Sequence, residues 1–154
     1  MNRLRLDWTN FLFLVSAHLL AVVAILYMVF VHFSWWTIAF SILWATCCGL
    51  GITGGYHRLF SHGAYKASAL VRAFYLAFGA ASVQNSALAW SADHRIHHAH
   101  TDTDQDPYDI RRGFWWAHIG WVIFQTKRDK GFELVKDLQK DPLVRFQHRH
   151  YILL

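Results

Sequence analysis

The chain begins with an apolar stretch that is too long for a single membrane-spanning helix. From Trp8 to Tyr56 the sequence contains no Asp, Glu, Lys or Arg. A helix needs about 20 apolar residues to cross the hydrocarbon core of a bilayer, so the stretch has room for two crossings. The aromatic sequence at 32–36 resembles the belt found at membrane interfaces and marks the turn. The pattern predicts a transmembrane hairpin with helices over roughly 10–31 and 35–55.

Small residues cluster where the second of these helices ends. Four glycines occur within seven positions, at Gly49, Gly51, Gly54 and Gly55. Glycines on one helix let another backbone approach closely in a membrane bundle. We therefore expect close packing, or a long apolar ligand, at this end of the hairpin.

A third apolar segment, 67–90, is interrupted by Arg72, Gln84 and Asn85. The histidine-rich sequence HRLFSH precedes it and HRIHH follows it. A single crossing would place these two sequences on opposite sides of the membrane, where they could not build one metal centre. We therefore expect the segment to dip into the interface or to return on the same side, with Gln84 and Asn85 facing protein or a cavity.

The remaining chain predicts a helical cap at the membrane surface. Residues 114–124 are apolar and aromatic but too few to span, so we expect them to lie in the interface. Residues from 127 onward form an amphipathic segment in which the polar side chains are predicted to point outward, notably Lys136, Asp137, Lys140 and Asp141. The fold class expected is all-α integral membrane, a transmembrane hairpin with a cytosolic and interfacial cap over 57–154.

Composition agrees with a membrane protein. Hydrophobic residues make up 55% of the 154 residues and charged residues 16%, below the quarter usual in soluble proteins. The net charge of +5 is not arranged as a basic stripe interleaved with base-stacking aromatics, which argues against nucleic acid binding. Arg3 and Arg5 precede the hairpin, and Arg58 and Lys66 follow it. By the positive-inside rule, both ends of the hairpin are predicted to be cytoplasmic.

The histidines of the cap have the spacing of metal ligands. His94, His97 and His98 stand at i, i+3 and i+4, which is one face of an α-helix. His57 and His62 lie about 140° apart around an α-helix, so they could bracket a metal if the chain leaves the helix between them. A His-rich polar face is the alternative for either group alone. The two groups together favour a metal centre, and imidazole suits iron, copper, zinc and nickel.

The other polar residues near these histidines are interpreted as supporting groups. The aspartates at 102, 104, 106 and 109 alternate along a loop that contains Pro107. This spacing predicts a solvated turn whose carboxylates hydrogen-bond histidine rings and are not themselves ligands. His18, His32 and His118 are interpreted as structural, His32 at the far membrane interface.

HRLFSH and HRIHH, together with DPYD, RRGFWWAHIGW and KDPLVRFQ, resemble sequences of the integral-membrane fatty acyl desaturase family, and within it the acyl-CoA delta-9 group. HRLFSH is similar to the family's HxxxxH box and HRIHH to its HxxHH box. The resemblance covers nearly the whole chain. It implies four transmembrane helices under a cytosolic cap, and O₂-dependent introduction of a cis double bond into a saturated acyl chain by a di-iron centre.

The resemblance also implies a set of site residues. The iron ligands would be His57, His62, His94, His97 and His98. Positions that line the acyl-CoA site or its tunnel are matched by Asn10, Gln84, Asn85, Trp90 and Asp93. The implied partners are O₂, an electron donor such as a b-type cytochrome or a ferredoxin with its reductase, and long-chain acyl-CoA or another acyl thioester or lipid. The implied location is a bacterial inner membrane or the endoplasmic reticulum, as a multi-pass protein.

This sequence departs from the family pattern at two points. Ala92 replaces an arginine of the CoA-contacting set, and a basic pair falls at Gln125 and Thr126, with Lys127 and Arg128 just beyond. The sequence therefore does not determine which carrier holds the acyl chain. The family's third His box is also absent, so 1–154 is expected to be one desaturase domain, incomplete at its C-terminus. With five of about nine donors for two irons, the chain alone is expected to enter membranes without desaturating any substrate.

Three other functions remain as alternatives at this point. A hydroxylase of the same di-iron superfamily would share the first hydrogen abstraction. A catalytically inactive membrane protein would bind acyl chains, or partner a complete desaturase, without iron. A zinc hydrolase is disfavoured because no HExxH sequence places a carboxylate base beside the ligands.

Overall fold

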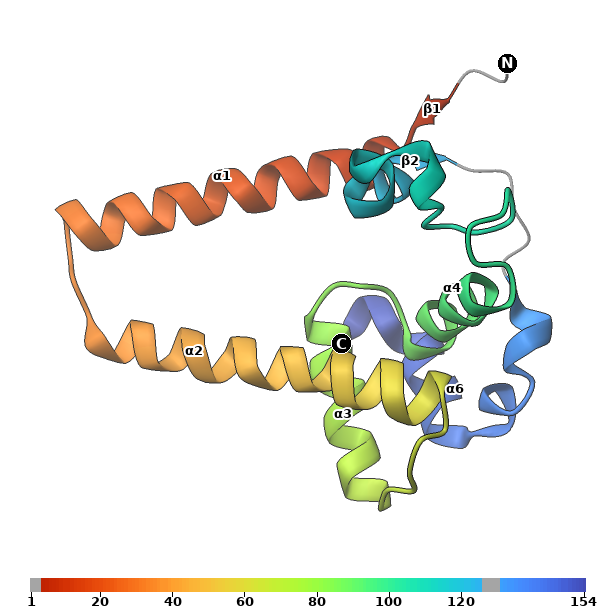
Figure 1. Cartoon of the computed structure of the whole chain (residues 1–154). Helices are drawn as coiled ribbons and strands as arrows, with labels where there is room; N and C mark the ends of the chain where they lie inside the picture. Colours follow the sequence, from red (N-terminus) through yellow and green to blue (C-terminus); the bar gives the residue numbers. More distant parts are fainter. Residues whose placement is uncertain (1–3, 126–130) are drawn as a thin grey trace.

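The computed structural model describes residues 4–125 and 131–154, and nearly every element in these ranges is helical (Figure 1). Arg3, Thr126, Lys127 and Arg128 lie outside the described residues. The longer helical elements are α1 (Trp8–Phe30), α2 (Trp35–Leu50), the π-helix η1 (Gly51–Ser61), α3 (Ala69–Ala81), α4 (Ala87–Ala99) and α6 (Pro142–His150). The short elements are β1 (Arg5–Leu6), η2 (Ile110–Arg112), η3 (Trp116–Gly120), α5 (Trp121–Ile123), β2 (Phe124–Gln125), η4 (Phe132–Val135), η5 (Leu138–Lys140) and η6 (Tyr151–Leu153).

The predicted hairpin is confirmed. Asp7 caps the start of α1 by accepting a hydrogen bond from the Asn10 backbone N–H, and Ser34 caps α2 by accepting from Thr37. The turn between them falls within the aromatic sequence that was expected to mark it. Both helical segments are long and apolar enough to cross a membrane. Figure 1 shows them antiparallel, joined at one end and splayed apart along their length.

The second helical segment continues further than predicted. It runs without a break from Trp35 to Ser61, so the chain leaves the helix between His57 and His62 as expected, but only at the residue directly before His62. Its last eleven residues are a π-helix, in which the His62 backbone N–H bonds the His57 carbonyl at 3.1 Å. Because π-helical hydrogen bonds join i to i+5, residues five apart stack above one another. The two rings are 4.7 Å apart between centroids.

Close packing of α3 accompanies this change of helix type. A Cβ at Gly51 would lie 2.6 Å from the Gly79 nitrogen, so the α3 backbone rests directly on the start of η1. Gly55 similarly receives the Tyr75 side chain, whereas a Cβ at Gly49 would meet nothing within 4 Å. The expected close packing is therefore found at Gly51 and Gly55, and the alternative of a long apolar ligand near Gly49 stays a prediction.

The third apolar segment returns to η1, as predicted. At 13 residues, α3 is too short to cross a bilayer. It is followed by a turn in which Val83 and Asn85 have positive φ values of 54° and 76°, and α4 then packs back against η1. Arg72, the charge that interrupted the apolar pattern, forms an ion pair with Asp141.

The core lies where η1, α3, α4 and the C-terminal segment meet. Its buried residues are Tyr56, Phe60, Leu76, Ala87, Leu88, Ala92, Val135, Leu138 and Val144. Asp141 caps α6 through two backbone N–H groups and is half-buried, so its predicted outward position is wrong. The carboxylate is held there because it serves Arg72 and the helix end together.

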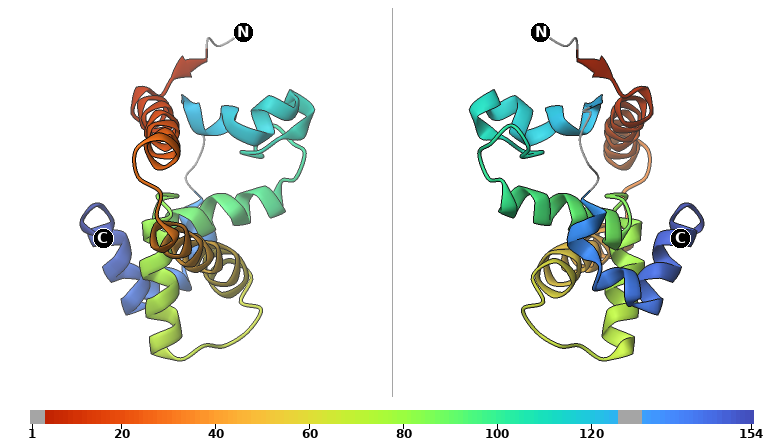
Figure 2. Two further views of the ribbon diagram at one scale, coloured as in Figure 1. Left: turned by 90° about the vertical axis from the view of Figure 1, so that its left-hand side faces the viewer. Right: turned by 90° about the vertical axis from the view of Figure 1, so that its right-hand side faces the viewer.

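A second, smaller layer lies along the N-terminal end of α1. It contains η2, η3, α5 and β2, and β2 pairs antiparallel with β1. The Asp7 backbone N–H donates to the Ile123 carbonyl at 2.8 Å. Both views in Figure 2 show this segment beside α1 and apart from α3, α4 and α6. The interfacial location of 114–124 stays a prediction.

Candidate metal centre

Four histidines converge from the two sequence segments on one point. His57 and His62 come from η1 and its C-terminal cap, and His94 and His98 come from α4. One ring nitrogen from each lies within 4.8 Å of the other three. The Nε2 atom of His62 is 3.2 Å from that of His57 and 3.0 Å from that of His94, and the Nε2 atoms of His94 and His98 are 3.1 Å apart.

Helix geometry on each side produces this convergence. The π-helix stacks His57 over His62, and the α-helical i, i+4 spacing stacks His94 over His98. The two helices are joined at this level by a buried hydrogen bond of 3.0 Å between the hydroxyls of Ser61 and Ser91. The four ligand candidates are therefore fixed by two stiff backbones and their contact.

The surroundings favour the neutral form of two of these rings, those of His94 and His62. Partial burial, followed by the nearby His57, His98, His62 and His97, lowers the pKa of His94 from 6.5 to about 3. Burial and the neighbouring histidines, with Arg95, also lower the pKa of His62. Neutral imidazole is the form that donates a lone pair to a metal ion.

The distances fit a metal ion. With metal–nitrogen bonds of about 2.0–2.1 Å, as for zinc, two ligands at a right angle have nitrogens about 3 Å apart. The three close Nε2 pairs have this separation. Four neutral imidazole nitrogens suit iron, copper, zinc or nickel. Among the described residues, this group provides one metal ion with four protein donors.

His97, the fifth predicted ligand, lies outside the group of four. Its Nδ1 atom donates to Asp106 Oδ1 at 2.9 Å, which leaves only Nε2 for a metal. The predicted hydrogen bond from the acidic loop to a histidine is thus confirmed at Asp106. The expectation of a solvated turn is wrong for Asp106 and Asp109, which are 5% and 3% exposed. A carboxylate can be buried there because each has several donors.

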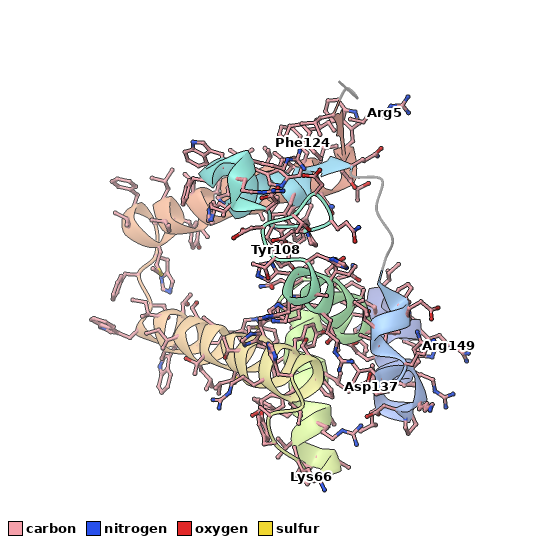
Figure 3. The ribbon with its side chains drawn as sticks, turned by 45° about the vertical axis from the view of Figure 1, so that its right-hand side comes forward. Arg5, Lys66, Tyr108, Phe124, Asp137 and Arg149 are labelled. Atoms are coloured by element: carbon pink, nitrogen blue, oxygen red, sulfur yellow. The ribbon has the colours of Figure 1, made fainter. Side chains whose placement is uncertain are left out.

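Asp106 is held charged by these donors. Burial raises its pKa, but hydrogen bonds from His97, Asp102 and Tyr108 outweigh burial and bring the pKa below its ordinary value. The same loop joins the two layers, because the Tyr108 ring lies 4.9 Å from His97 and 4.5 Å from Trp121 (Figure 3). The carboxylate consequently orients His97 and fixes its Nδ1 proton.

Some predicted substrate residues lie beside the histidines. The Trp90 ring stacks on His94 at 4.9 Å, and its indole N–H donates to the Gln84 side-chain oxygen at 3.3 Å. Asp93 is half-buried on α4, next to His94 in sequence. Trp90 therefore contacts the cluster directly, and Gln84 is linked to the cluster through Trp90.

Asn85 and Asn10 have other surroundings. The Asn85 backbone carbonyl accepts from the Tyr56 hydroxyl and its N–H donates to the Tyr151 hydroxyl. Asn10, on α1, donates to the Val122 carbonyl at 3.0 Å in the other layer. Asn10 is therefore not brought together with the remaining predicted residues.

The histidines interpreted as structural have local partners. His18 Nδ1 lies 2.7 Å from the Leu14 carbonyl within α1, and the His118 ring stacks on Phe114 at 5.5 Å. His32 is exposed at the turn of the hairpin, at the end remote from η1. In the described part of the chain, none of the three belongs to the metal group.

Two polar residues that the sequence reasoning missed support the site. Gln147 is 2% exposed and donates to the Tyr56 hydroxyl and the Leu76 carbonyl, while its side-chain oxygen accepts from the Ala87 N–H. Gln147 follows buried Val144 by three residues on α6 and so lies on the same helix face. This spacing would have predicted that Gln147 is buried. Arg95 is the second, and it stands between two predicted ligands in HRIHH.

Fold and site together define a class. The chain has two helices of membrane-spanning length and a histidine cluster able to hold a metal ion. Residues 33–151 match the family model described as fatty acid desaturase. The chain belongs to the fatty acid desaturase family.

Several curated proteins are similar to it. The chain is 51% identical to "Probable acyl-CoA desaturase" of Schizosaccharomyces pombe over 75% of this chain and 24% of that protein. It is 37% identical to "Delta(9)-fatty-acid desaturase fat-7" of Caenorhabditis elegans over 99% of this chain and 46% of that protein. It is 35% identical to "sn-1 stearoyl-lipid 9-desaturase" of Anabaena variabilis over 97% and 55%. The chain thus spans between about a quarter and about half the length of these relatives.

Proposed function

We propose that this chain is part of a membrane acyl desaturase in which His57, His62, His94 and His98 hold iron. The observation that carries the proposal is the convergence of their ring nitrogens within 4.8 Å. An unactivated methylene has no acidic proton, so side-chain acid–base chemistry cannot begin the reaction. Bound iron would supply the oxidising power, with O₂, two electrons from a donor and two protons from solvent, to remove two hydrogens from the acyl chain and release two waters.

The chain's own residues bind, orient and shield. Asp106 fixes the His97 ring so that Nε2 alone is available, and we propose that His97 contributes to a second iron together with donors beyond the five histidines. Trp90 covers one side of His94 and packs near Tyr56, which keeps water from that side. The electron donor proposed is a b-type cytochrome or a ferredoxin with its reductase.

The substrate proposed is a long-chain acyl group on CoA, another thioester or a lipid. The relatives' names support both carriers, since the Schizosaccharomyces pombe protein is named for acyl-CoA and the Anabaena variabilis protein for a lipid. Gln84, Trp90 and Asp93 are proposed to line the acyl path because they border the cluster or lie next to it in sequence. Asn85 and Asn10 remain proposed contacts, Asn10 from the α1 side.

Fatty-acid profiling tests the activity. The chain replaces the matching segment of the fat-7 enzyme, and the chimera is expressed in a strain lacking its own desaturase. New monounsaturated acyl chains are expected from the chimera and from its His32→Ala variant, but none from His94→Ala. The chain of 154 residues alone is expected to produce none. Oxygenated acyl chains would indicate a hydroxylase, and an iron-free, inactive chimera would indicate an acyl-binding protein.

Membrane sidedness is tested separately. We propose that both ends of the α1–α2 hairpin, and with them the histidines, face the cytoplasm. Single cysteines at Lys66 and Phe33, introduced after replacing Cys47 and Cys48 by alanine, report the two ends of the second helical segment. Lys66 should react from the cytoplasmic side and Phe33 from the opposite side. The same sidedness at both positions would contradict a membrane crossing by α2.

A further inference from the structure

Arg95 uses every N–H of its guanidinium group. Nε donates to the Ser61 carbonyl at 2.9 Å, and Nη2 donates to the Phe60 carbonyl at 2.9 Å. Nη1 donates to the Leu134 carbonyl at 2.7 Å. The two remaining bonds go to Asp137, from Nη1 to Oδ1 at 2.7 Å and from Nη2 to Oδ2 at 2.9 Å. A guanidinium has five donors, so its hydrogen-bonding capacity is filled.

Two of these acceptors are main-chain carbonyls at the C-terminal end of η1. Phe60 and Ser61 are the last residues of η1, immediately before His62. Carbonyls at a helix C-terminus have no partner within the helix and carry the negative end of its dipole. A cation that binds both carbonyls therefore fixes the direction in which the chain leaves η1 and presents His62.

Arg95 itself is anchored on both sides. It follows His94 directly in α4, so its backbone position is tied to that ring. Its planar fork is held by Asp137, the residue that precedes η5, in a bidentate pair. The same pairing lowers the pKa of Asp137 below its ordinary value. Figure 3 shows Asp137 on the C-terminal segment beside α4.

We propose that Arg95, oriented by Asp137, is a positioning residue that sets His62 against His94 in the metal centre. The inference rests on the proposed metal site and adds a residue that does not touch the metal. Arg95, which follows His94, binds the carbonyl of Ser61, which precedes His62. The Nε2 atoms of His94 and His62 are 3.0 Å apart. The geometry requires a planar, five-donor side chain, so lysine cannot replace arginine here.

The inference differs from an ordinary surface salt bridge. Asp137 is 59% exposed on its side chain, and an exposed ion pair alone contributes little to stability. The main-chain carbonyls are the acceptors that reach the histidine segment. A charge swap, Arg95→Asp with Asp137→Arg, should therefore not restore the site, because it would leave the Phe60 and Ser61 carbonyls without a donor.

The first measurement is hydrogen exchange of the metal-free protein in micelles. The variants are Arg95→Lys and Asp137→Asn, with Glu133→Gln as the control, which breaks the nearby exposed Lys136–Glu133 pair. Amides at 62–64, which bond to carbonyls of 57–59 in η1, should exchange at least about tenfold faster in the two test variants. Exchange in α3 and in the control should stay at the parent rate. Parent-like exchange at 62–64 in both test variants would overturn the proposal.

The second measurement is a Co²⁺ titration followed by visible absorption. Residues that orient metal ligands typically change metal affinity 10–100-fold when replaced. We expect Arg95→Lys and Asp137→Asn to bind Co²⁺ about 10–100-fold more weakly, with an altered spectrum at saturation, and Glu133→Gln to match the parent. A merely structural role would leave the spectrum of the saturated site unchanged. Parent-like affinity and spectrum in both test variants also overturn the proposal.

The two measurements separate this inference from the proposed function. If the parent chain gives no histidine-dependent Co²⁺ spectrum, the proposed metal centre is wrong, and hydrogen exchange alone then decides whether Arg95 positions the His62 segment. If the parent binds Co²⁺ and the variants match it, the centre stands and the role of Arg95 is wrong. Neither measurement requires the Arg95→Ala variant, so a failure of that variant to fold does not affect the result.

Discussion

The α1–α2 hairpin and the body formed by η1, α3, α4 and α6 are held together in different ways. Neither α1 nor α2 contains a buried residue, and side chains such as Leu20 and Trp36 are 68% and 86% exposed. In the body, Tyr56, Ala92 and Val144 are fully buried. Figure 1 shows the same contrast, with two splayed helices on one side and a packed group on the other.

The difference indicates how each region is stabilised. Apolar helices with satisfied backbones are stable in lipid without packing on one another, since lipid removes the hydrophobic drive for their association. The body instead is stabilised by apolar side chains that it buries and by polar groups that pair within the chain. All four clustered histidines belong to the body, so packing within the body brings their ring nitrogens together.

The largest expected effect on unfolding free energy comes from truncating a buried leucine of the body, compared with an exposed leucine of the hairpin. Leu76 on α3 is 5% exposed, and Leu76→Ala should lower the free energy of unfolding by about 2–5 kcal/mol. Leu20→Ala on α1 should change it by less than about 0.5 kcal/mol. Chemical unfolding in mixed micelles measures both. Equal losses would mean that α1 is packed as tightly as the body.

A smaller effect should follow from removing one ligand. His94 has close nitrogen neighbours on two sides, so His94→Ala should weaken Co²⁺ binding by at least about 100-fold, or about 2.7 kcal/mol. His32→Ala, at the turn of the hairpin, should bind Co²⁺ like the parent. Isothermal titration measures both affinities. Loss of binding in both variants would point to a folding defect instead of ligation.

Two glycines provide a matched comparison of backbone approach. A Cβ at Gly79 would lie 2.2 Å from the Tyr56 ring, whereas one at Gly49 would meet nothing within 4 Å. Gly79→Ala should cost about 1–3 kcal/mol of unfolding free energy through overpacking. Gly49→Ala should be neutral or stabilise by up to about 1 kcal/mol because alanine favours the helix. A parent-like melting temperature for Gly79→Ala would contradict the close contact.

The most gradual effect should be the pH dependence of the stability of the metal-free body. The folded-state pKa of His94 lies at about 3 and that of His62 is lowered, so the unfolded chain binds more protons below pH 6.5. Stability should consequently be highest above about pH 6.5 and fall as the pH decreases toward the folded-state pKa.

Thermal melts between about pH 7 and pH 4.5 measure this slope. His94→Ala should flatten it. An unchanged slope in His94→Ala would contradict the attribution of the pH dependence to the histidine cluster. Metal loading should decline over the same range because protons compete for the rings.

Several features were determined by the sequence alone. The absence of charge from Trp8 to Tyr56 and the aromatic turn predicted both long helices, because bilayer thickness sets the length of an apolar run. The i, i+4 spacing of His94 and His98 predicted a shared face, since α-helical geometry is local. The need for one metal centre predicted that the segment 67–90 returns.

Only the tertiary structure decided how His57, His62 and His97 lie. On an α-helix, His57 and His62 would lie on different faces. Here α3 packs on Gly51, where η1 begins with i→i+5 hydrogen bonds, and these bonds stack the two rings. His97 has the spacing of a ligand, yet its Nδ1 atom is bound by Asp106, which the loop after α4 carries back to it.

The partners of Arg95, Arg72 and Gln147 were likewise invisible in the sequence. Asp137 lies 42 residues from Arg95, and Tyr56 lies 91 residues from Gln147. Hydrophobic periodicity reports which face of a helix is apolar, because that depends only on the helical repeat. Which carboxylate or carbonyl satisfies a buried donor depends on where distant backbones meet, and that is set by packing of the whole body.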